Sequence, residues 1–201
     1  IVLADMENCG FMADRNGIME YNKEISARLD EITKEIYDTV GYEFNINSPK
    51  QLGSALFEKL ALPHGKKTKS GYSTSAEVLE SLKYEHPAVA LILQYRTYSK
   101  LKSTYCDGLL KVIGEDGRIH SSFNQTETRT GRISSTEPNL QNIPVRTELG
   151  RELRRFFIAK DGCVLVDADY SQIELRVLAH IANDKAMIEA FKNNEDIHSI
   201  T

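Results

Sequence analysis

The feature that most constrains the fold of this chain is a long, regular spacing of apolar residues near its start. Between Ile18 and Val40, apolar side chains recur in steps of three and four, at positions 18, 21, 25, 29, 32, 36 and 40. Because an α-helix has about 3.6 residues per turn, that spacing places them on one helical face. Gly41 follows directly and is suited to end the helix. The sequence therefore predicts a long amphipathic helix.

Further helices are predicted up to about residue 112. The Ser48-Pro49 pair is typical of a helix start. Thr74 and Glu77 form a capping box for a short helix, and Pro87 opens a helix of about 25 residues. Residues 64–73 are polar, basic and glycine-containing, which predicts a loop. The first hundred or so residues are thus expected to be helical.

The pattern changes at Gly114, after which strand signals dominate. Residues 118–126 alternate as a strand does, and residues 153–158 and 163–168 are two further strand candidates. Residues 172–182 predict a short helix with its apolar side chains turned inward. The predicted fold class is α+β, with a helical part over 1–113 and an antiparallel sheet with a packed helix over 114–201.

Charge is distributed unevenly along the chain. The net charge is −4, yet residues 61–160 carry 16 Lys and Arg against 10 Asp and Glu. A basic middle between acidic ends indicates a local contact with phosphates, whereas the alternative is that these cations only solvate helices. No apolar run is long enough to predict a membrane span. Three widely spaced cysteines, Cys9, Cys106 and Cys163, predict reduced packing residues in a cytoplasmic protein.

Two carboxylates, Asp167 and Asp169, follow the apolar run 163–166 and precede a Ser171-x-x-Glu174 helix start. Carboxylates between a strand end and a helix start are well placed to hold a divalent ion against phosphates, because Mg²⁺ prefers oxygen ligands. A phosphohydrolase site built on the same two aspartates is disfavoured, since no general base lies within the expected reach.

The segment 126–146 is long for a loop and therefore indicates function. It combines arginines with amides, the side chains that contact phosphates and base edges. The alternative is an asparagine-rich turn that satisfies its own backbone. The residues concerned are Arg129, Arg132, Arg146, Asn139, Gln141 and Asn142.

Two motifs, TGRISSTEPNLQNIPVR (130–146) and DYSQIELR (169–176), closely resemble the polymerase domain of the family A DNA polymerases. Shorter stretches agree, namely LADMENCGF, NSPKQLG, KSGYSTSAEVLE, KLKSTYCDGL and EDIHSIT. The resemblance implies an incomplete polymerase "right hand". Its helical thumb would span residues 1–113, with a palm-associated segment at about 1–15. Residues 114–201 would form part of the palm and run into the fingers.

The resemblance also implies roles for individual residues. Asp169 and the carbonyl of Tyr170 would ligate two Mg²⁺ ions at the catalytic centre. Gln172, Glu174 and His198 would bind the incoming dNTP, with Glu174 excluding a ribose 2′-hydroxyl. The residues expected to contact duplex primer–template DNA are Lys100, Lys102, Arg132, Asn139, Gln141, Asn142 and Arg146, together with the 66–75 loop of the thumb.

The family's second metal-binding aspartate and its nucleotide-binding fingers helix are expected beyond Thr201, so the chain reads as part of a longer protein. The chain alone is therefore expected to lack polymerase activity, and an uncovered sheet edge is expected to favour self-association. The alternative function is a non-catalytic module that binds duplex DNA without metal; the presence of Asp169 argues against it.

Overall fold

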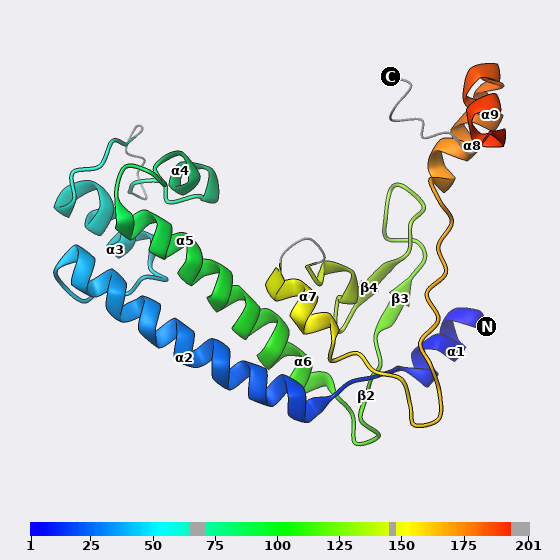
Figure 1. Cartoon of the computed structure of the whole chain (residues 1–201), viewed down its shortest axis with the longest axis horizontal. Coiled ribbons are helices and arrows are strands. Elements are labelled where there is room, and N and C mark those ends of the chain that lie inside the picture. Colours follow the sequence, from blue (N-terminus) through cyan, green and yellow to red (C-terminus); the bar gives the residue numbers. More distant parts are fainter. Residues whose placement is uncertain (65–70, 145–147, 194–201) are drawn as a thin grey trace. The chain divides into compact units, whose positions relative to one another are not determined.

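The computed structural model describes residues 1–64, 71–144 and 148–193. It divides into two compact units, residues 1–162 and 163–201, which are described separately (Figure 1). The predicted boundary between residues 113 and 114 remains a prediction.

The first unit is built on two long, adjacent helical segments, α2 and the continuous run α5–η2–α6 (Figure 1). Both predicted long helices are confirmed. The helical elements of this unit are α1 (Val2–Cys9), α2 (Arg15–Val40), α3 (Pro49–Gly53), the π-helical η1 (Ser54–Lys59), α4 (Ala76–Ser81), α5 (Pro87–Lys100), the π-helical η2 (Leu101–Cys106), α6 (Asp107–Val112), the 3-10 turn η3 (Leu140–Asn142) and α7 (Glu148–Arg154).

Helix α2 forms as its apolar spacing predicts. The Asp14 carboxylate caps its start by accepting a hydrogen bond from Gly17 N at 2.9 Å. Gly41 ends it in the left-handed region with φ of 91°, a conformation that glycine adopts at little cost. The side chains buried along it are Ile18, Ile25, Ile32, Ile36 and Val40.

Helix starts agree with the sequence where the cap is purely local. Ser48 caps α3 and Pro49 occupies its first turn, as predicted. The predicted cap of α4 is wrong by one residue, because the cap is Ser75. Thr74 is buried instead, and Arg96 donates to its carbonyl at 2.6 Å and to its hydroxyl at 3.4 Å. A tertiary contact therefore takes the hydroxyl that the sequence assigns to the helix.

Two apolar cores lie along the helix pair. The first joins the C-terminal half of α2 to α3, η1, α4 and α5, and its fully buried members include Ile32, Ile36, Leu52, Leu56, Leu79 and Ile92. The second joins the N-terminal part of α2 to η2, α6 and α7, and includes Ile18, Leu101, Cys106, Ile119 and Leu153.

Within the described residues, the β-strands form two small antiparallel sheets. Strand β1 (Phe11–Met12) pairs with β2 (Arg118–Ile119), and β3 (Ser122–Asn124) pairs with β4 (Ser134–Thr136). The alternating segment 118–126 is therefore shared between two sheets. The segment 126–146 carries β4 and η3, so it has more regular structure than its turn-rich composition suggests.

Both other strand candidates are wrong. Residues 153–158 complete helix α7 and then make one bridge, between Phe157 and Ala13. Leu153 explains this, since it is fully buried in the second core as a helical residue. Residues 163–168 form no strand because no neighbouring strand pairs with them among the residues described, and Val164 is 81% exposed.

The second unit contains helices α8 (Ile173–Ala182) and α9 (Lys185–Lys192). The predicted Ser171–Glu174 capping box is wrong, because Gln172 precedes α8 in a left-handed conformation without a side-chain cap. The predicted inward side chains of α8 are exposed. Only α9 packs against α8 within the described part of this unit, so there is no surface to bury them. The exposed residues are Ile173, Val177, Leu178 and Ile181.

The cysteines are free, and only Cys106 is buried, so the packing role predicted for Cys9 and Cys163 is wrong. Among the described residues, no helix has the length and apolar character needed to cross a membrane.

Candidate functional site

Strands β3 and β4 form a hairpin that carries Arg132. We call residues 122–136 the Arg132 hairpin. Asn124 Nδ2 donates to Thr136 Oγ1 at 3.1 Å, and Ser134 Oγ donates to Glu127 Oε2 at 3.2 Å. Arg132 itself is exposed at the chain-reversal end of the hairpin. Arg132 therefore projects from a hairpin that is stabilised by hydrogen bonds between its own side chains.

A buried pair of hydroxyls lies at the base of this hairpin. Ser121 and Ser135 are 4% and 1% exposed, and their Oγ atoms are 2.6 Å apart. Leu140 N donates to Ser135 Oγ at 3.2 Å, and Ser121 Oγ donates to the Pro138 carbonyl at 2.7 Å. The pair therefore joins the hairpin to the start of η3.

The predicted amide side chains lie next to the hairpin and serve partly structural roles. The Asn139 side chain accepts a hydrogen bond from Gln141 N at 3.0 Å. This is the kind of contact expected of an asparagine-rich turn that satisfies its own backbone. Gln141 Nε2 donates to the carbonyl of Ile133 at 2.8 Å, and so ties η3 to the residue after Arg132. The carbonyl of Asn142 accepts from Tyr105 OH at 2.6 Å. Asn139, Gln141 and Asn142 nevertheless remain exposed.

The two predicted thumb lysines differ in environment. Lys100 is exposed at the end of α5. Lys102 is half-buried and forms an ion pair with Asp107 at 3.1 Å, and Asp107 also accepts from Asn22 at 2.7 Å. Those two hydrogen-bond donors counter the burial of Asp107, and the pKa of this carboxyl lies below its usual value. The charge of Lys102 is therefore already partly neutralised.

Some predicted residues lie outside the described part of the chain. These are Arg146, His198 and residues 66–70 of the predicted thumb loop. The remainder of that loop, from Gly71 to Ser75, includes the Thr74 contact with Arg96.

In the second unit, Asp167, Asp169 and Tyr170 lie in an exposed segment without regular structure. Arg176 braces the following turn, since its Nε donates to the Ser171 carbonyl at 2.8 Å and its guanidinium lies 4.5 Å from the Phe191 ring centre. Glu174 is exposed in the first turn of α8. Over the described residues, no group of three or more His, Cys, Asp or Glu could hold a metal ion.

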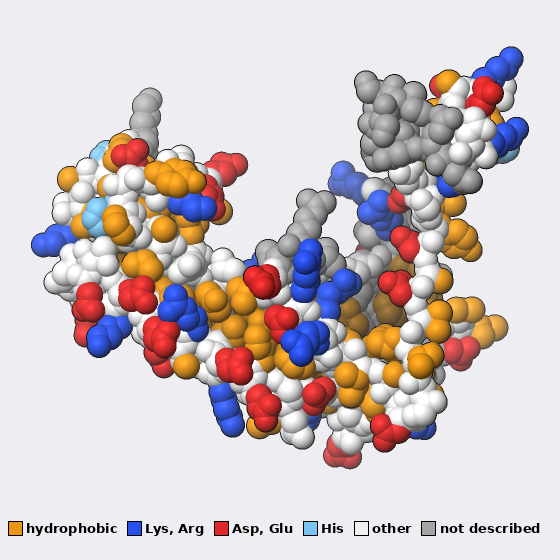
Figure 2. All heavy atoms as spheres, in the orientation of Figure 1, with side chains coloured by type: hydrophobic (Ala, Val, Ile, Leu, Met, Phe, Trp, Pro, Cys, Tyr) orange, Lys and Arg blue, Asp and Glu red, His pale blue; other side chains and the backbone are white. Residues whose placement is uncertain are grey.

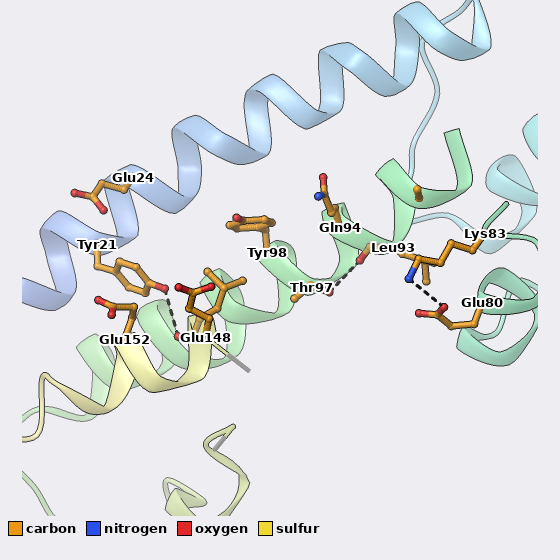
Figure 3. A pocket seen from close by; sticks show the side chains of 12 residues that line it. Tyr21, Glu24, Glu80, Lys83, Leu93, Gln94, Thr97, Tyr98, Glu148 and Glu152 are labelled. Atoms are coloured by element: carbon orange, nitrogen blue, oxygen red, sulfur yellow. Dashed lines mark hydrogen bonds and ion pairs between the residues drawn. The ribbon is translucent and has the colours of Figure 1, made fainter. Parts of the chain in front are cut away.

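A groove of about 780 Å³ lies between α2, α4, α5 and α7 in the first unit (Figure 3). Its lining is acidic, with four glutamates and one lysine: Glu24, Glu80, Glu148, Glu152 and Lys83. Tyr21 points into it and donates to the Leu149 carbonyl at 3.3 Å; burial, reinforced by nearby anionic groups, raises the pKa of Tyr21 to about 12. Such a lining repels phosphates, so this groove is a poor site for a nucleic-acid backbone. Elsewhere on the face in Figure 2, acidic and basic side chains are interspersed.

The sequence did not identify the residues that brace the candidate site. Tyr105, Ser121 and Ser135 belong to this group. A signal existed for Ser121, which shares the inward strand face with Ile119 and Phe123, because a hydroxyl on a buried face needs a partner.

Comparison with known proteins identifies relatives over the whole chain. The model of the family described as DNA polymerase family A matches residues 15–201. The DNA polymerase I of Caldicellulosiruptor bescii is 56% identical over 201 residues, which is 100% of this chain and 24% of that protein. The DNA polymerase I of Bacillus subtilis strain 168 is 53% identical over 203 residues, covering 100% of this chain and 23% of that protein.

A solved structure also resembles the chain over nearly its whole length. The POL domain of Pol1 from M. smegmatis, in complex with DNA primer-template and dNTP, matches with a TM-score of 0.84 and 45% sequence identity. The match covers 98% of this chain and 35% of that one. This chain spans about a quarter of the length of the two DNA polymerase I relatives.

Proposed function

The chain belongs to the family A DNA polymerases, and from that premise we propose that it supplies the duplex-binding thumb and the first part of the palm of a DNA-directed DNA polymerase. The observation that carries the proposal is the match of both motif-bearing segments to a polymerase domain solved with primer-template and dNTP. The proposed reaction is transfer of a nucleotide from a dNTP to the 3′-hydroxyl of a DNA primer. A DNA substrate and three free cysteines favour the cytoplasm as its location.

We assign the duplex contacts to the first unit. Arg132 would enter the minor groove, where acceptor atoms occur on every base pair, so its contact would not depend on sequence. Asn139, Gln141, Asn142 and Arg146 would contact neighbouring parts of the template and primer. Lys100 and Lys102 would bind phosphates, and Lys100 would contribute more because Asp107 already pairs with Lys102.

We assign the metal and nucleotide contacts to the second unit. Asp169 and the carbonyl of Tyr170 are oxygen donors, the kind that Mg²⁺ takes. They are too few to complete two octahedral sites, and the described residues contain no carboxylate cluster that would add to them. When bound, two such ions would activate the primer hydroxyl and steady the leaving pyrophosphate. Gln172, Glu174 and His198 would contact the dNTP.

Binding of a labelled primer–template duplex across a range of salt concentrations tests the first assignment. The slope of log affinity against log salt counts the phosphates neutralised, at about 0.9 per phosphate. Lys100→Ala should reduce the slope by about one. Arg132→Ala should weaken binding by roughly tenfold on every sequence tested, the order of one lost groove contact. Lys34→Ala, which removes an exposed cation of α2, serves as the control. Unchanged affinity in Arg132→Ala would refute the minor-groove role.

Primer extension tests the catalytic part. The 201-residue chain should bind duplex without extending it in Mg²⁺ or Mn²⁺, because its described residues supply too few metal ligands. Extension that is lost in Asp169→Ala would show that the chain holds a complete centre and would overturn this expectation. A non-catalytic duplex-binding module predicts instead that duplex binding needs neither Mg²⁺ nor Mn²⁺ and is unaltered in Asp169→Ala.

A further inference from the structure

The C-terminal end of helix α1 is anchored to strand β2 through backbone carbonyl groups. Arg118 Nη1 donates to the carbonyls of Cys9 at 3.1 Å and Gly10 at 3.2 Å. A cation at this end complements the helix dipole and satisfies carbonyls that the helix leaves free. The anchor places the end of α1 against β2.

His120 makes a second contact with the same end of α1. Its Nδ1 lies 2.7 Å from the Glu7 carbonyl oxygen, and its Nε2 lies 3.0 Å from Asp116 Oδ2. A carbonyl and an ionised carboxylate only accept hydrogen bonds, so both ring nitrogens must donate. The two contacts can therefore exist together only when the ring is an imidazolium.

Gly10 allows this close approach. It has φ of +60°, and a Cβ built on it would lie 2.7 Å from His120 Cε1 and 3.0 Å from the Ile119 carbonyl oxygen. Either property alone disfavours a side chain here. The imidazolium thus packs directly on the backbone that ends α1.

The side chain of Glu7 extends this contact to the Arg132 hairpin. Phe123 N donates to Glu7 Oε1 at 2.6 Å. Phe123 is the central residue of β3 and lies opposite Ser135 of β4. The carboxylate takes the place that a carbonyl of a neighbouring strand would take at this edge, so α1 fixes the position of β3.

We infer that Glu7 and His120 are positioning residues that hold the Arg132 hairpin for duplex binding, although neither residue would touch DNA. Glu7 fixes β3 directly. His120 fixes Glu7 by holding the end of α1. We call the contacts of Glu7 with Phe123 N and of His120 with the Glu7 carbonyl the clamp. The clamp is a property of the fold. The inference rests on the proposed function only for the statement that the hairpin binds duplex DNA.

The clamp should weaken as pH rises. The groups facing His120 are the Glu7 carbonyl from α1, Asp116 from the preceding turn and Arg118 from β2, beside the Cys9 thiol. The Glu7 carbonyl and then the Asp116 carboxylate raise the pKa of His120 above its ordinary value, against the opposing Arg118 charge. Because the pKa is raised on folding, the contribution is complete below about 6.5 and is lost as pH rises through the folded value.

Amide hydrogen exchange and duplex binding, measured on the whole chain, test the inference together. Glu7→Ala should increase the exchange of the Phe123 amide and weaken duplex binding roughly threefold to tenfold, because fewer molecules hold the binding-competent hairpin. Glu7→Gln keeps an acceptor oxygen at the same place and should restore both. Asp5→Ala, which removes an exposed carboxylate from the same helix, should change neither.

A pH series separates positioning from general stability. The protection factor of the Phe123 amide should fall in the wild-type chain as pH rises above about 6.5. In His120→Gln, which cannot acquire a charge, that fall should disappear. An identical pH profile in the two proteins would overturn the role of His120.

The binding outcomes distinguish this inference from the proposed function. If the wild-type chain binds duplex but Glu7→Ala binds equally well, the positioning role is overturned. If Phe123 exchange is unaltered in Glu7→Ala, the clamp itself is overturned. A wild-type chain without duplex affinity would instead overturn the proposed function, while the exchange experiments would still decide whether the clamp exists.

Discussion

The buried hydroxyl pair at the base of the Arg132 hairpin gives a quantitative prediction, because its four groups form one directed chain. Leu140 N donates to Ser135 Oγ, the two hydroxyls share a hydrogen bond, and Ser121 Oγ donates to the Pro138 carbonyl. Ser135 Oγ also lies 3.1 Å from that carbonyl. The two serines are similarly buried, yet their removal should have different costs.

The difference follows from which group loses its only partner. Ser135→Ala leaves the amide of Leu140 without its acceptor, which costs about 2 kcal/mol. Ser121→Ala leaves no such donor, since Ser135 can still accept from Leu140 N and donate to the Pro138 carbonyl. We expect its cost to be about 1 kcal/mol, the net value of one hydrogen bond. The double variant should cost less than the sum, because both hydroxyls belong to one network.

Amide hydrogen exchange at Leu140 measures these costs locally. At fixed pH, the amide should exchange roughly 30-fold faster in Ser135→Ala and roughly fivefold faster in Ser121→Ala, the factors that correspond to those energies. Ser26→Ala is the control, since its hydroxyl bonds the Asn22 carbonyl within α2. Equal acceleration in both serine variants, or a larger effect of Ser121→Ala, would refute the directed chain.

Four further predictions concern packing and burial. Gly150→Ala should destabilise the first unit by about 2 kcal/mol in urea unfolding, because the new Cβ would collide with the Pro144 carbonyl oxygen. Gly108→Ala, whose Cβ would contact only an atom at 3.8 Å, should instead stabilise α6 by roughly 0.5–1 kcal/mol; a loss there would contradict the packing. Ile32→Ala removes a fully buried side chain and should cost about 2–5 kcal/mol, a lowered urea midpoint with unchanged slope being the expected result. Burial raises the pKa of Cys106 to about 11, so a thiol reagent at pH 8 should titrate the two exposed cysteines quickly and the third only after denaturant is added.

The sequence predicts local structure well where one segment decides it. Helix α2 follows from its apolar spacing, and the Ser48–Pro49 start follows from neighbours two or three residues away. Thr74 fails as a cap because Arg96, a distant residue in the sequence, binds it. The strand predicted at 163–168 fails for a related reason. A strand forms only when a second strand pairs with it, and the sequence of 163–168 does not say which segment that would be.

The candidate site was predictable in its residue types more than in its contacts. Arg132 and Gln141 stand out in the sequence, but nothing in their spacing indicates that Gln141 binds the Ile133 carbonyl. Lys102 is predicted to face phosphates, and its spacing gives no sign that it also pairs with Asp107, five residues later. Helical periodicity predicts pairs three and four residues apart, and it cannot anticipate a pair created by a local change in helix type.

The π-helical segment η2 also affects which side chains of the run α5–η2–α6 face the second core. In a regular α-helix, each step of four residues turns the side chain about 40° past a full revolution, so a series of such steps soon leaves its face. Helix α2 avoids the drift because its apolar residues are spaced by steps of both three and four residues. The other run buries Leu101, Tyr105 and Leu109, which are four apart. The wider turn of η2 takes up part of the excess rotation, so the phase of this helix is adjusted once, at the point where Tyr105 reaches the Asn142 carbonyl. Deleting a single residue from 101–106 should therefore be far more disruptive than replacing one, because it would rotate every side chain that follows.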